Sequence, residues 1–351
     1  MQYDLTFITN VPAFYKINLF NRLNEFLKIK VIFISKTSEI RSDDFYGDEL
    51  TFDHVFLSSK PYEIRNKLQV LFSLAGELLK TKSKIFIFSG WETKEACLCS
   101  YLTPKNKNAI VVESSVLESE LSGIKFFLKK KYLNRMSIGL PSGLLQKSVL
   151  TVLNFQGDVF ITHGVGISNY TQDDFSEYIE TEKTNSGLDF LYIGRLSPEK
   201  NLNLLIKAFN GLSHRLTIVG SGPQERELQK LAKNNILFLG YKNNSDLASV
   251  FKRSDVFILP SLSEPWGLVV EEALISGVPV LVSDKVGCKD DLVTNDVGLV
   301  FEAESVDSLL SSIYKMEKNI QYYKNNLKEK SYSYLSKKQL NVYGSLIDKN
   351  I

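Results

Sequence analysis

The sequence predicts an α/β protein built from two doubly wound, Rossmann-like domains, one in each half of the chain. Short apolar runs rich in β-formers alternate with longer runs of helical period. This alternation stops once, at the polar stretch 180–187 (ETEKTNSG), and then restarts. The length of 351 residues also exceeds that of a usual single domain.

In the first half, Ile17, Phe20, Leu23 and Leu27 recur at helical spacing and mark the first helix. We expect strands at 5–9, 31–35, 55–57, 85–88, 110–112 and 159–161. We expect helices at 14–27, 63–80, 94–101 and 123–136. Strands that alternate with helices form a parallel sheet with helices on both faces.

The second half repeats the pattern. Strands are expected at 190–193, 216–219, 236–239, 256–259 and 280–282, and helices at 202–212, 224–232, 246–253 and 268–275. We therefore predict an N-terminal domain at 1–183, a C-terminal domain at 184–330, and a final helix at 331–351 that packs back on the N-terminal domain. Ligands of such sheets bind at the carboxyl ends of the strands, so we expect the two domains to face a central cleft.

Charge and cysteine content exclude several classes. Lys and Arg number 42 against 40 Asp and Glu, a net charge of +2, which disfavours a dedicated nucleic-acid binder. The three cysteines, Cys97, Cys99 and Cys288, do not suit a disulfide framework. The chain starts without a basic leader and has no run of eighteen apolar residues. We therefore expect a cytoplasmic enzyme.

Four motifs in the second half each follow an expected strand and open a helix. They are 194–201 (GRLSPEKN), 220–223 (GSGP), 238–241 (FLGY) and 264–272 (EPWGLVVEE). In the first motif, Arg195 and Lys200 are two permanent cations suited to a diphosphate, unless they are ordinary surface cations. The glycines of the second motif let backbone approach a ligand closely, although such turns are also common structural features.

The fourth motif combines carboxylates with a helix start. Glu264 is expected on the loop that faces the cleft, and Glu272 inside the following helix, within reach of a ribose. A solvated helix position is the alternative for Glu272 and the favoured interpretation of Glu271. Around Gly267, the unpaired N–H groups of a helix N-terminus suit an anion.

Together these motifs resemble the C-terminal domain of retaining GT-B glycosyltransferases of family 4. That family shows G-R-L-x(3)-K-[GN], G-x-G-P, a glycine at the base pocket, and E-x7-E followed by E-A-x(3)-G-x-P-V, which residues 271–287 (EEALISGVPVLVSDKVG) continue. The resemblance implies a GT-B fold and a metal-independent hexosyltransferase without cofactor. It implies retention of anomeric configuration, a nucleotide-sugar donor (UDP before GDP), and a glycan or lipid-linked saccharide acceptor in surface polysaccharide synthesis.

The same resemblance implies roles for single residues. Arg195 and Lys200 hold the donor diphosphate, Glu272 holds the ribose, and Glu264 is the catalytic residue at the donor sugar. Further donor contacts are expected at the base and from the main chain, at Gly222, Tyr241, Trp266, Gly267 and Leu268.

The N-terminal half departs from the family pattern. Its first loop, 9–16 (TNVPAFYK), lacks the usual glycine pair and makes Lys16 a candidate acceptor contact. Glu113 stands where many relatives carry a histidine and is either a second catalytic residue or part of a helix-capping Ser/Glu cluster. Trp91 either stacks on an acceptor sugar or covers the sheet end. His163, where relatives show a P-N-G-V-D turn, is interpreted as structural or as part of the cleft rim.

The helix expected at 123–136 is basic and amphipathic. Its basic residues, which include Lys129, Lys130 and Lys131, interleave with apolar and aromatic ones, which suits an anionic membrane surface, such as the inner face of the cytoplasmic membrane. A solvated basic face is the alternative. The paired aspartates at 43–44, 173–174 and 290–291 lack D-x-D spacing, so no metal is expected. Two other functions remain open: a GT-B-type nucleotide-sugar epimerase and a non-enzymatic two-domain sugar-binding protein.

Overall fold

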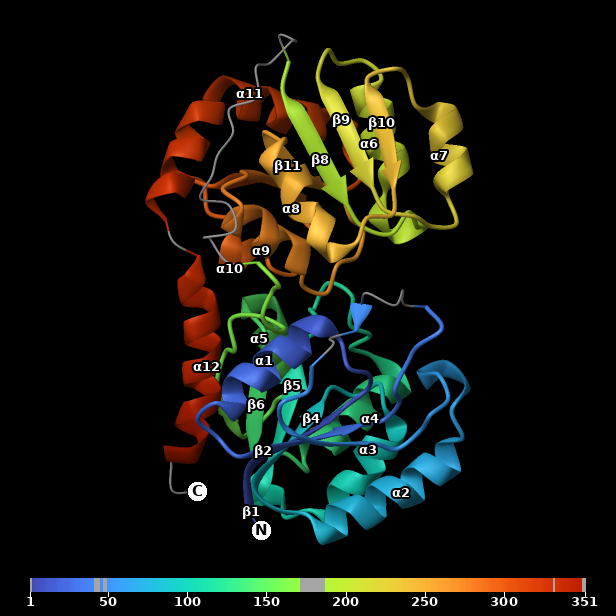
Figure 1. The fold of residues 1–351 in the computed structure, drawn as a ribbon, viewed down its shortest axis with the longest axis vertical. Helices are drawn as coiled ribbons and strands as arrows, with labels where there is room; N and C mark the ends of the chain where they lie inside the picture. Colours follow the sequence, from blue (N-terminus) through green and yellow to red (C-terminus); the bar gives the residue numbers. More distant parts are fainter. Residues whose placement is uncertain (1, 41–44, 47–48, 171–186, 331, 349–351) are drawn as a thin grey trace. The chain divides into compact units, whose positions relative to one another are not determined.

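The computed structural model describes residues 2–40, 45–46, 49–170, 187–330 and 332–348 (Figure 1). These residues form two compact units, each described here by itself. Unit 1 combines Met1–Asn169 with Leu335–Ile351, and unit 2 is Tyr170–Tyr334. The domain boundary expected near residue 184 lies outside the described residues.

Unit 1 contains a seven-stranded parallel sheet in the order β3-β2-β1-β4-β5-β6-β7. Its strands are β1 (Gln2–Thr9), β2 (Ile29–Phe33), β3 (Asp53–Phe56), β4 (Lys82–Ser89), β5 (Asn108–Val112), β6 (Ile138–Pro141) and β7 (Asp158–Val159). The central strand β1 pairs on both sides, with Leu5 opposite Ile29 and Ile85. The buried strands are nearly continuous apolar runs, as expected when helices cover both faces.

Helices cover each face of this sheet. The core on one face includes side chains of α1 (Phe14–Asn24) and α12 (Ser333–Asp348), and Tyr343 of α12 lies 5.7 Å from Phe7 of β1 between ring centroids. The core on the other face includes side chains of α2 (Lys67–Lys80), α3 (Lys94–Cys99), α4 (Gly123–Leu133) and α5 (Leu144–Val152). Side chains of β1 alternate between the two cores, with Phe7 in the first and Ile8 in the second.

Unit 2 contains a six-stranded parallel sheet in the order β10-β9-β8-β11-β12-β13. Its strands are β8 (Asp189–Ile193), β9 (Arg215–Val219), β10 (Ile236–Gly240), β11 (Val256–Leu259), β12 (Val280–Ser283) and β13 (Gly298–Phe301). Its helices are α6 (Leu202–Phe209), α7 (Glu225–Leu231), α8 (Asn244–Lys252), α9 (Leu268–Ile275), α10 (Lys289–Leu292) and α11 (Val306–Glu329).

The predicted fold class is confirmed: both units are α/β with doubly wound parallel sheets. Several boundaries differ. The helix expected at 63–80 is a 3-10 turn, Tyr62–Ile64, followed by α2, because the Asn66 side chain accepts the Gln69 N–H and caps α2 there. Strands β6 and β13 were not expected, since each has four residues and includes glycine or proline, which are typical of turns.

Each sheet has one topological switch point, where the connections leave in opposite directions from neighbouring strands. In unit 1 this point lies between β1 and β4, and in unit 2 between β8 and β11. Ligands of open α/β sheets bind at such points, outside the carboxyl ends of the strands. Within the described residues, no helix combines the length and the apolar character needed to span a bilayer.

Candidate functional site

The loops after β8 and β11 meet at the switch point of unit 2. Lys200 Nζ, on the first loop, forms an ion pair with Glu264 Oε2, on the second. The Leu262 N–H also donates to the Glu199 carbonyl oxygen at 2.8 Å. The side chains of Lys200 and Glu264 are 17% and 15% exposed, so the pair is screened less than a surface pair. The structure thus brings together two predicted site residues that are 64 positions apart.

Arg195 lies on the same loop as Lys200 and is exposed. Its carbonyl oxygen accepts the Tyr192 hydroxyl at 2.9 Å, which anchors the backbone of the loop. Burial raises the pKa of Glu199, but the Ser197 hydroxyl and then the charges of Lys200 and Arg195 hold it below its ordinary value. Both cations therefore lie close to the Glu199 carboxylate, and Lys200 is also paired with Glu264.

The glycines of the GSGP motif pack against the chain itself. A Cβ at Gly220 would lie 1.9 Å from the Gly194 carbonyl oxygen, and a Cβ at Gly222 would lie 2.4 Å from that of Leu196. The Leu196 N–H donates to the Ser221 carbonyl oxygen at 2.9 Å. These glycines therefore let the loops after β8 and β9 contact each other through their backbones. The close backbone approach that the motif allows is thus made to a neighbouring loop.

The loop 264–267 is bound along its main chain to the segment 285–288. Glu264 forms a parallel bridge with Val286, and the Gly287 N–H donates to the Glu264 carbonyl oxygen at 2.8 Å. Helix α9 begins directly afterwards, at Leu268. Its cap residue, Gly267, has a φ of 98° and offers no side chain to the first N–H groups. The Val270 N–H donates to the Gly267 carbonyl oxygen at 2.9 Å. The first N–H groups of a helix carry the positive end of its dipole.

The expectation that Glu271 is solvated is wrong. Glu271 is 3% exposed and Glu272 is 7% exposed. Helix α9 is covered all round, since its residues from Val270 to Ile275 are all buried, so even a Glu-Glu pair lies inside. Burial raises the pKa of Glu271 to about 8, and the Trp266 indole opposes that rise. Glu271 is therefore mostly neutral at pH 7.

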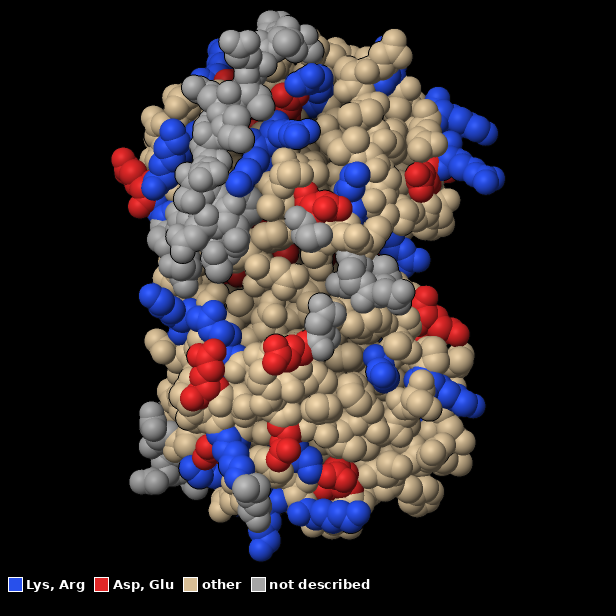
Figure 2. Space-filling model, in the orientation of Figure 1, with Lys and Arg blue, Asp and Glu red and all other residues tan. Residues whose placement is uncertain are grey.

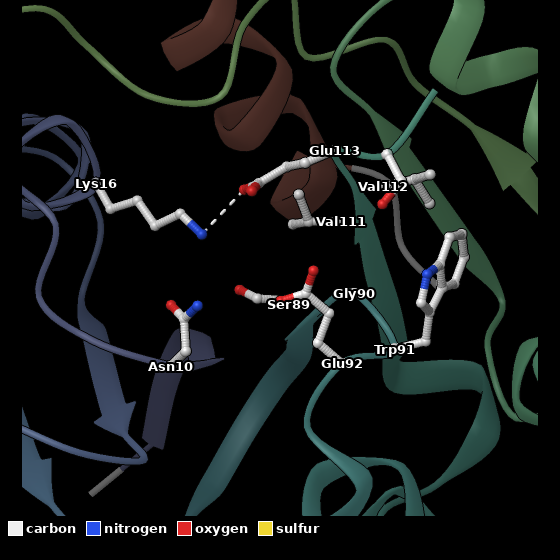
Figure 3. Close-up of a pocket in the computed structure, with 10 residues that line it drawn as sticks. Asn10, Lys16, Ser89, Gly90, Trp91, Glu92, Val111, Val112 and Glu113 are labelled. Carbon is white, nitrogen blue, oxygen red and sulfur yellow. Dashed lines mark ion pairs between the residues drawn. The ribbon is translucent and has the colours of Figure 1, made fainter. Parts of the chain in front are cut away.

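The switch point of unit 1 holds a pocket, drawn in Figure 3. Lys16 Nζ and Glu113 Oε1 form an ion pair there at 3.0 Å. Lys16 is buried, which lowers its pKa, but the Glu113 carboxylate outweighs burial and raises the pKa above its ordinary value. The Ser115 N–H donates to Glu118 Oε1 at 3.2 Å within a turn at which no helix begins, while Glu113 lines the pocket.

Trp91 also lines this pocket and is half-buried (Figure 3). Lys129 Nζ lies 4.7 Å from the centroid of the Trp91 ring and donates to the Glu120 carbonyl oxygen at 3.3 Å. One face of the indole therefore already has a cation against it. The helix that carries Lys129 and the predicted acceptor residue are thus in contact.

The sequence analysis gave no site role to several pocket residues, among them Asn10, Ser89 and Glu92. They lie at the ends of β1 and β4, or just beyond, so the order of strands around the switch point could have found them. His163 lies outside the pocket lining, with a φ of 59°, and burial together with Lys338 lowers its pKa. The described residues contain no group of three His, Cys, Asp or Glu side chains that could hold a metal ion.

Comparisons with known proteins agree with this geometry. Residues 174–334 match the sequence model of the glycosyl transferases group 1 family. The chain is 32% identical, over 44% of each chain, to an uncharacterized glycosyltransferase of Methanocaldococcus jannaschii. It is 28% identical to a GDP-mannose-dependent alpha-mannosyltransferase of Mycobacterium tuberculosis, over 44% of this chain and 42% of that one. The matched part thus spans less than half the length of these curated relatives.

The fold has solved counterparts along its whole length. The structure of Anabaena HepE in complex with UDP matches with a TM-score of 0.72 over 98% of each chain, at 12% sequence identity. A likeness at this identity concerns the fold, which is the two-sheet GT-B fold. The chain therefore has the GT-B fold, and its sequence over residues 174–334 is similar to the glycosyl transferases group 1 family.

Proposed function

We propose that the protein is a retaining glycosyltransferase that moves a sugar from a nucleotide-sugar donor, UDP-linked before GDP-linked, to a saccharide or lipid-linked saccharide. The observation that carries this proposal is the Lys200–Glu264 pair at the switch point of unit 2, beside the open N-terminus of α9. HepE, which shares the fold, was solved with UDP. The M. tuberculosis relative uses GDP-mannose, so GDP donors belong in the same test.

The donor diphosphate would lie where positive charge gathers. Lys200 and the exposed Arg195 would bind its oxygens through charge-assisted hydrogen bonds, each worth roughly 1.5–3 kcal/mol. The first N–H groups of α9, at Gly267 and Leu268, would add main-chain contacts. Glu272, inside the helix, would serve the ribose. Gly222 and Tyr241, at the ends of β9 and β10, would frame the base.

Glu264 would act at the donor sugar. Its carboxylate forms an ion pair with Lys200. When the diphosphate binds Lys200, the carboxylate becomes available to hold a ring hydroxyl. Retention then needs no covalent nucleophile, because the leaving phosphate can take the acceptor proton on the face from which it departs. Lys200, Arg195 and the helix dipole stabilise the leaving charge, so no divalent ion is required.

The acceptor would bind in the pocket of unit 1. Glu113 would accept hydrogen bonds from the saccharide and Lys16 would donate them. The Trp91 ring would supply an apolar face for a sugar. The first test is thermal shift with a panel of UDP- and GDP-sugars, since a ligand that binds the native state raises its melting temperature. Slow donor hydrolysis in excess EDTA would then show catalysis without a metal, whereas interconversion of the donor would point to the epimerase alternative.

We also propose that the outer face of α4 contacts an anionic membrane, where lipid-linked acceptors and surface polysaccharide synthesis would be found. Ile124, Phe127 and Leu128 are 79%, 70% and 61% exposed and follow helical spacing with the exposed Lys131. Residues 67–152 carry 13 Lys and Arg against 6 Asp and Glu, in a chain of net charge +2. Exposed apolar side chains next to basic ones suit an anionic lipid surface.

On the face drawn in Figure 2, positive and negative side chains of the described residues are interspersed over both units. Lys129, in contrast to Lys131, bends back onto Trp91 and Glu120, so it contributes less to this surface than the sequence suggests. We propose a cytoplasmic protein bound peripherally to the inner face of the membrane.

A further inference from the structure

Trp266 and Glu271 occupy two paired positions at the start of α9. Gly267 is the cap residue, so Trp266 precedes the cap and Glu271 is the fourth residue of the helix. In many helices these two positions hold apolar side chains that pack together. This contact, the hydrophobic staple, fixes the angle at which the chain enters the helix. Here the second position holds a glutamate.

Both side chains are inside unit 2. Trp266 is 2% exposed and Glu271 is 3% exposed. Neither the indole Nε1 nor the carboxyl Oε2 has a hydrogen-bond partner among the described residues. The indole nevertheless faces the carboxyl closely enough to oppose the rise of its pKa. A neutral carboxylic acid can occupy such a site, whereas an unpaired carboxylate there is strongly disfavoured.

Among the described residues, no cation contributes to the shifted pKa of Glu271. The groups that face it are the Trp266 indole and the Cys288 thiol. Burial first, and then Glu264, Glu271 and Asp291, raise the pKa of Cys288, so the thiol is neutral. The pair of Trp266 and Glu271 is therefore an apolar contact only while Glu271 keeps its proton.

The loop before α9 is held from two sides. On its main chain, the Cys288 N–H donates to the Trp266 carbonyl oxygen at 2.9 Å. On its side-chain face, the indole packs within unit 2 together with Glu271. We propose that neutral Glu271 is a positioning residue, which through Trp266 fixes the loop that carries Glu264 and Gly267, and that ionisation of Glu271 loosens this loop. The effect on sugar transfer rests on the proposed function, whereas the effect on Trp266 does not.

The sign of the pH dependence follows from the direction of the shift. The pKa of Glu271 in the folded protein, about 8, is above its ordinary value of 4.5. Its contribution to stability is therefore fully present below pH 4.5 and is lost as the pH rises through about 8. At one unit above the folded pKa, only about one tenth of the molecules keep the proton.

Trp266 itself reports on this ionisation. The chain has two tryptophans, so Trp91→Phe leaves Trp266 as the only one. In this background we expect the tryptophan fluorescence to change with a midpoint near pH 8. The change should vanish in Glu271→Gln and persist in Glu227→Gln, which makes the same chemical change on the exposed face of α7. A fluorescence transition that survives Glu271→Gln, or the lack of any transition in the Trp91→Phe parent, would overturn the proposal.

Nucleotide affinity tests the consequence for the loop. We expect the affinity for UDP to fall by up to about tenfold between pH 7 and 9 in the parent, and to stay flat in Glu271→Gln. If that variant does not fold, Glu271→Leu completes an apolar staple and should give the same flat profile. A UDP affinity that ignores a clear fluorescence transition would overturn the positioning role. Absence of UDP binding at every pH would instead contradict the proposed function, and the fluorescence would still decide the state of Glu271.

Discussion

Lys200, on the loop after β8, and Glu264, on the loop after β11, form an ion pair across the switch point of unit 2. Each partner satisfies the other in the structure, so a bound diphosphate would have to compete with Glu264 for Lys200. Such competition couples phosphate binding to release of the carboxylate. Substitutions of Lys200 and Glu264, made singly and together, therefore distinguish the loss of phosphate binding from the loss of the carboxylate.

The first prediction concerns the diphosphate. Arg195→Ala and Lys200→Ala should each weaken UDP binding by well over tenfold, since a lost charge-assisted contact costs more than roughly 1.4 kcal/mol. Lys230→Ala, a matched change on the exposed face of α7, should leave binding unchanged. Isothermal titration with UDP measures all three. Wild-type affinity in both loop variants would refute the assignment of these cations.

The second prediction separates the two glutamates of the E-x7-E motif. Glu264→Gln should lower turnover by more than tenfold without weakening UDP binding, because Glu264 acts at the sugar and competes with the diphosphate for Lys200. Glu272→Gln should instead weaken UDP binding first. Steady-state kinetics and titration of the same preparations distinguish them. If Glu264→Gln were to lose UDP affinity as strongly as Lys200→Ala, Glu264 would belong to phosphate binding.

The pocket of unit 1 gives the third prediction. Glu113→Gln and Trp91→Ala should raise the KM for the acceptor or lower transfer, while donor hydrolysis by water continues. Lys16→Met should in addition lower the free energy of unfolding by about 1–3 kcal/mol, because it leaves Glu113 without its partner. Urea unfolding and acceptor kinetics measure the two effects. Unchanged acceptor kinetics in both Glu113→Gln and Trp91→Ala would exclude this pocket.

The fourth prediction concerns the membrane. Binding to vesicles of anionic lipid should fall with added salt. It should also fall when Lys130 and Lys131 are changed together to Glu, and when Phe127 is changed to Ser. Lys207→Glu, an exposed lysine of α6, is the matched control and should bind as the wild type does. Sedimentation with vesicles provides the measurement. Equal binding by all variants would show that α4 has a solvated basic face and does not contact the membrane.

The sequence was informative where local pattern decides the structure. The bounds of β11 and α9 agree with the expected 256–259 and 268–275, because an apolar run and a glycine mark them. The ion pairs Lys200–Glu264 and Lys16–Glu113 depend on strand order, which no local pattern contains. Glu271 was misjudged for the same reason, since its burial comes from tertiary packing around α9.

The central claim is transfer of a sugar from a nucleotide donor with retained configuration. The most direct measurement is NMR of the product formed from an α-linked nucleotide sugar, identified by the thermal-shift panel, and a saccharide acceptor. The account predicts an α-linked product together with release of the nucleoside diphosphate. A β-linked product would contradict the retaining mechanism, and release of no nucleotide with any donor of the panel would contradict the proposed function.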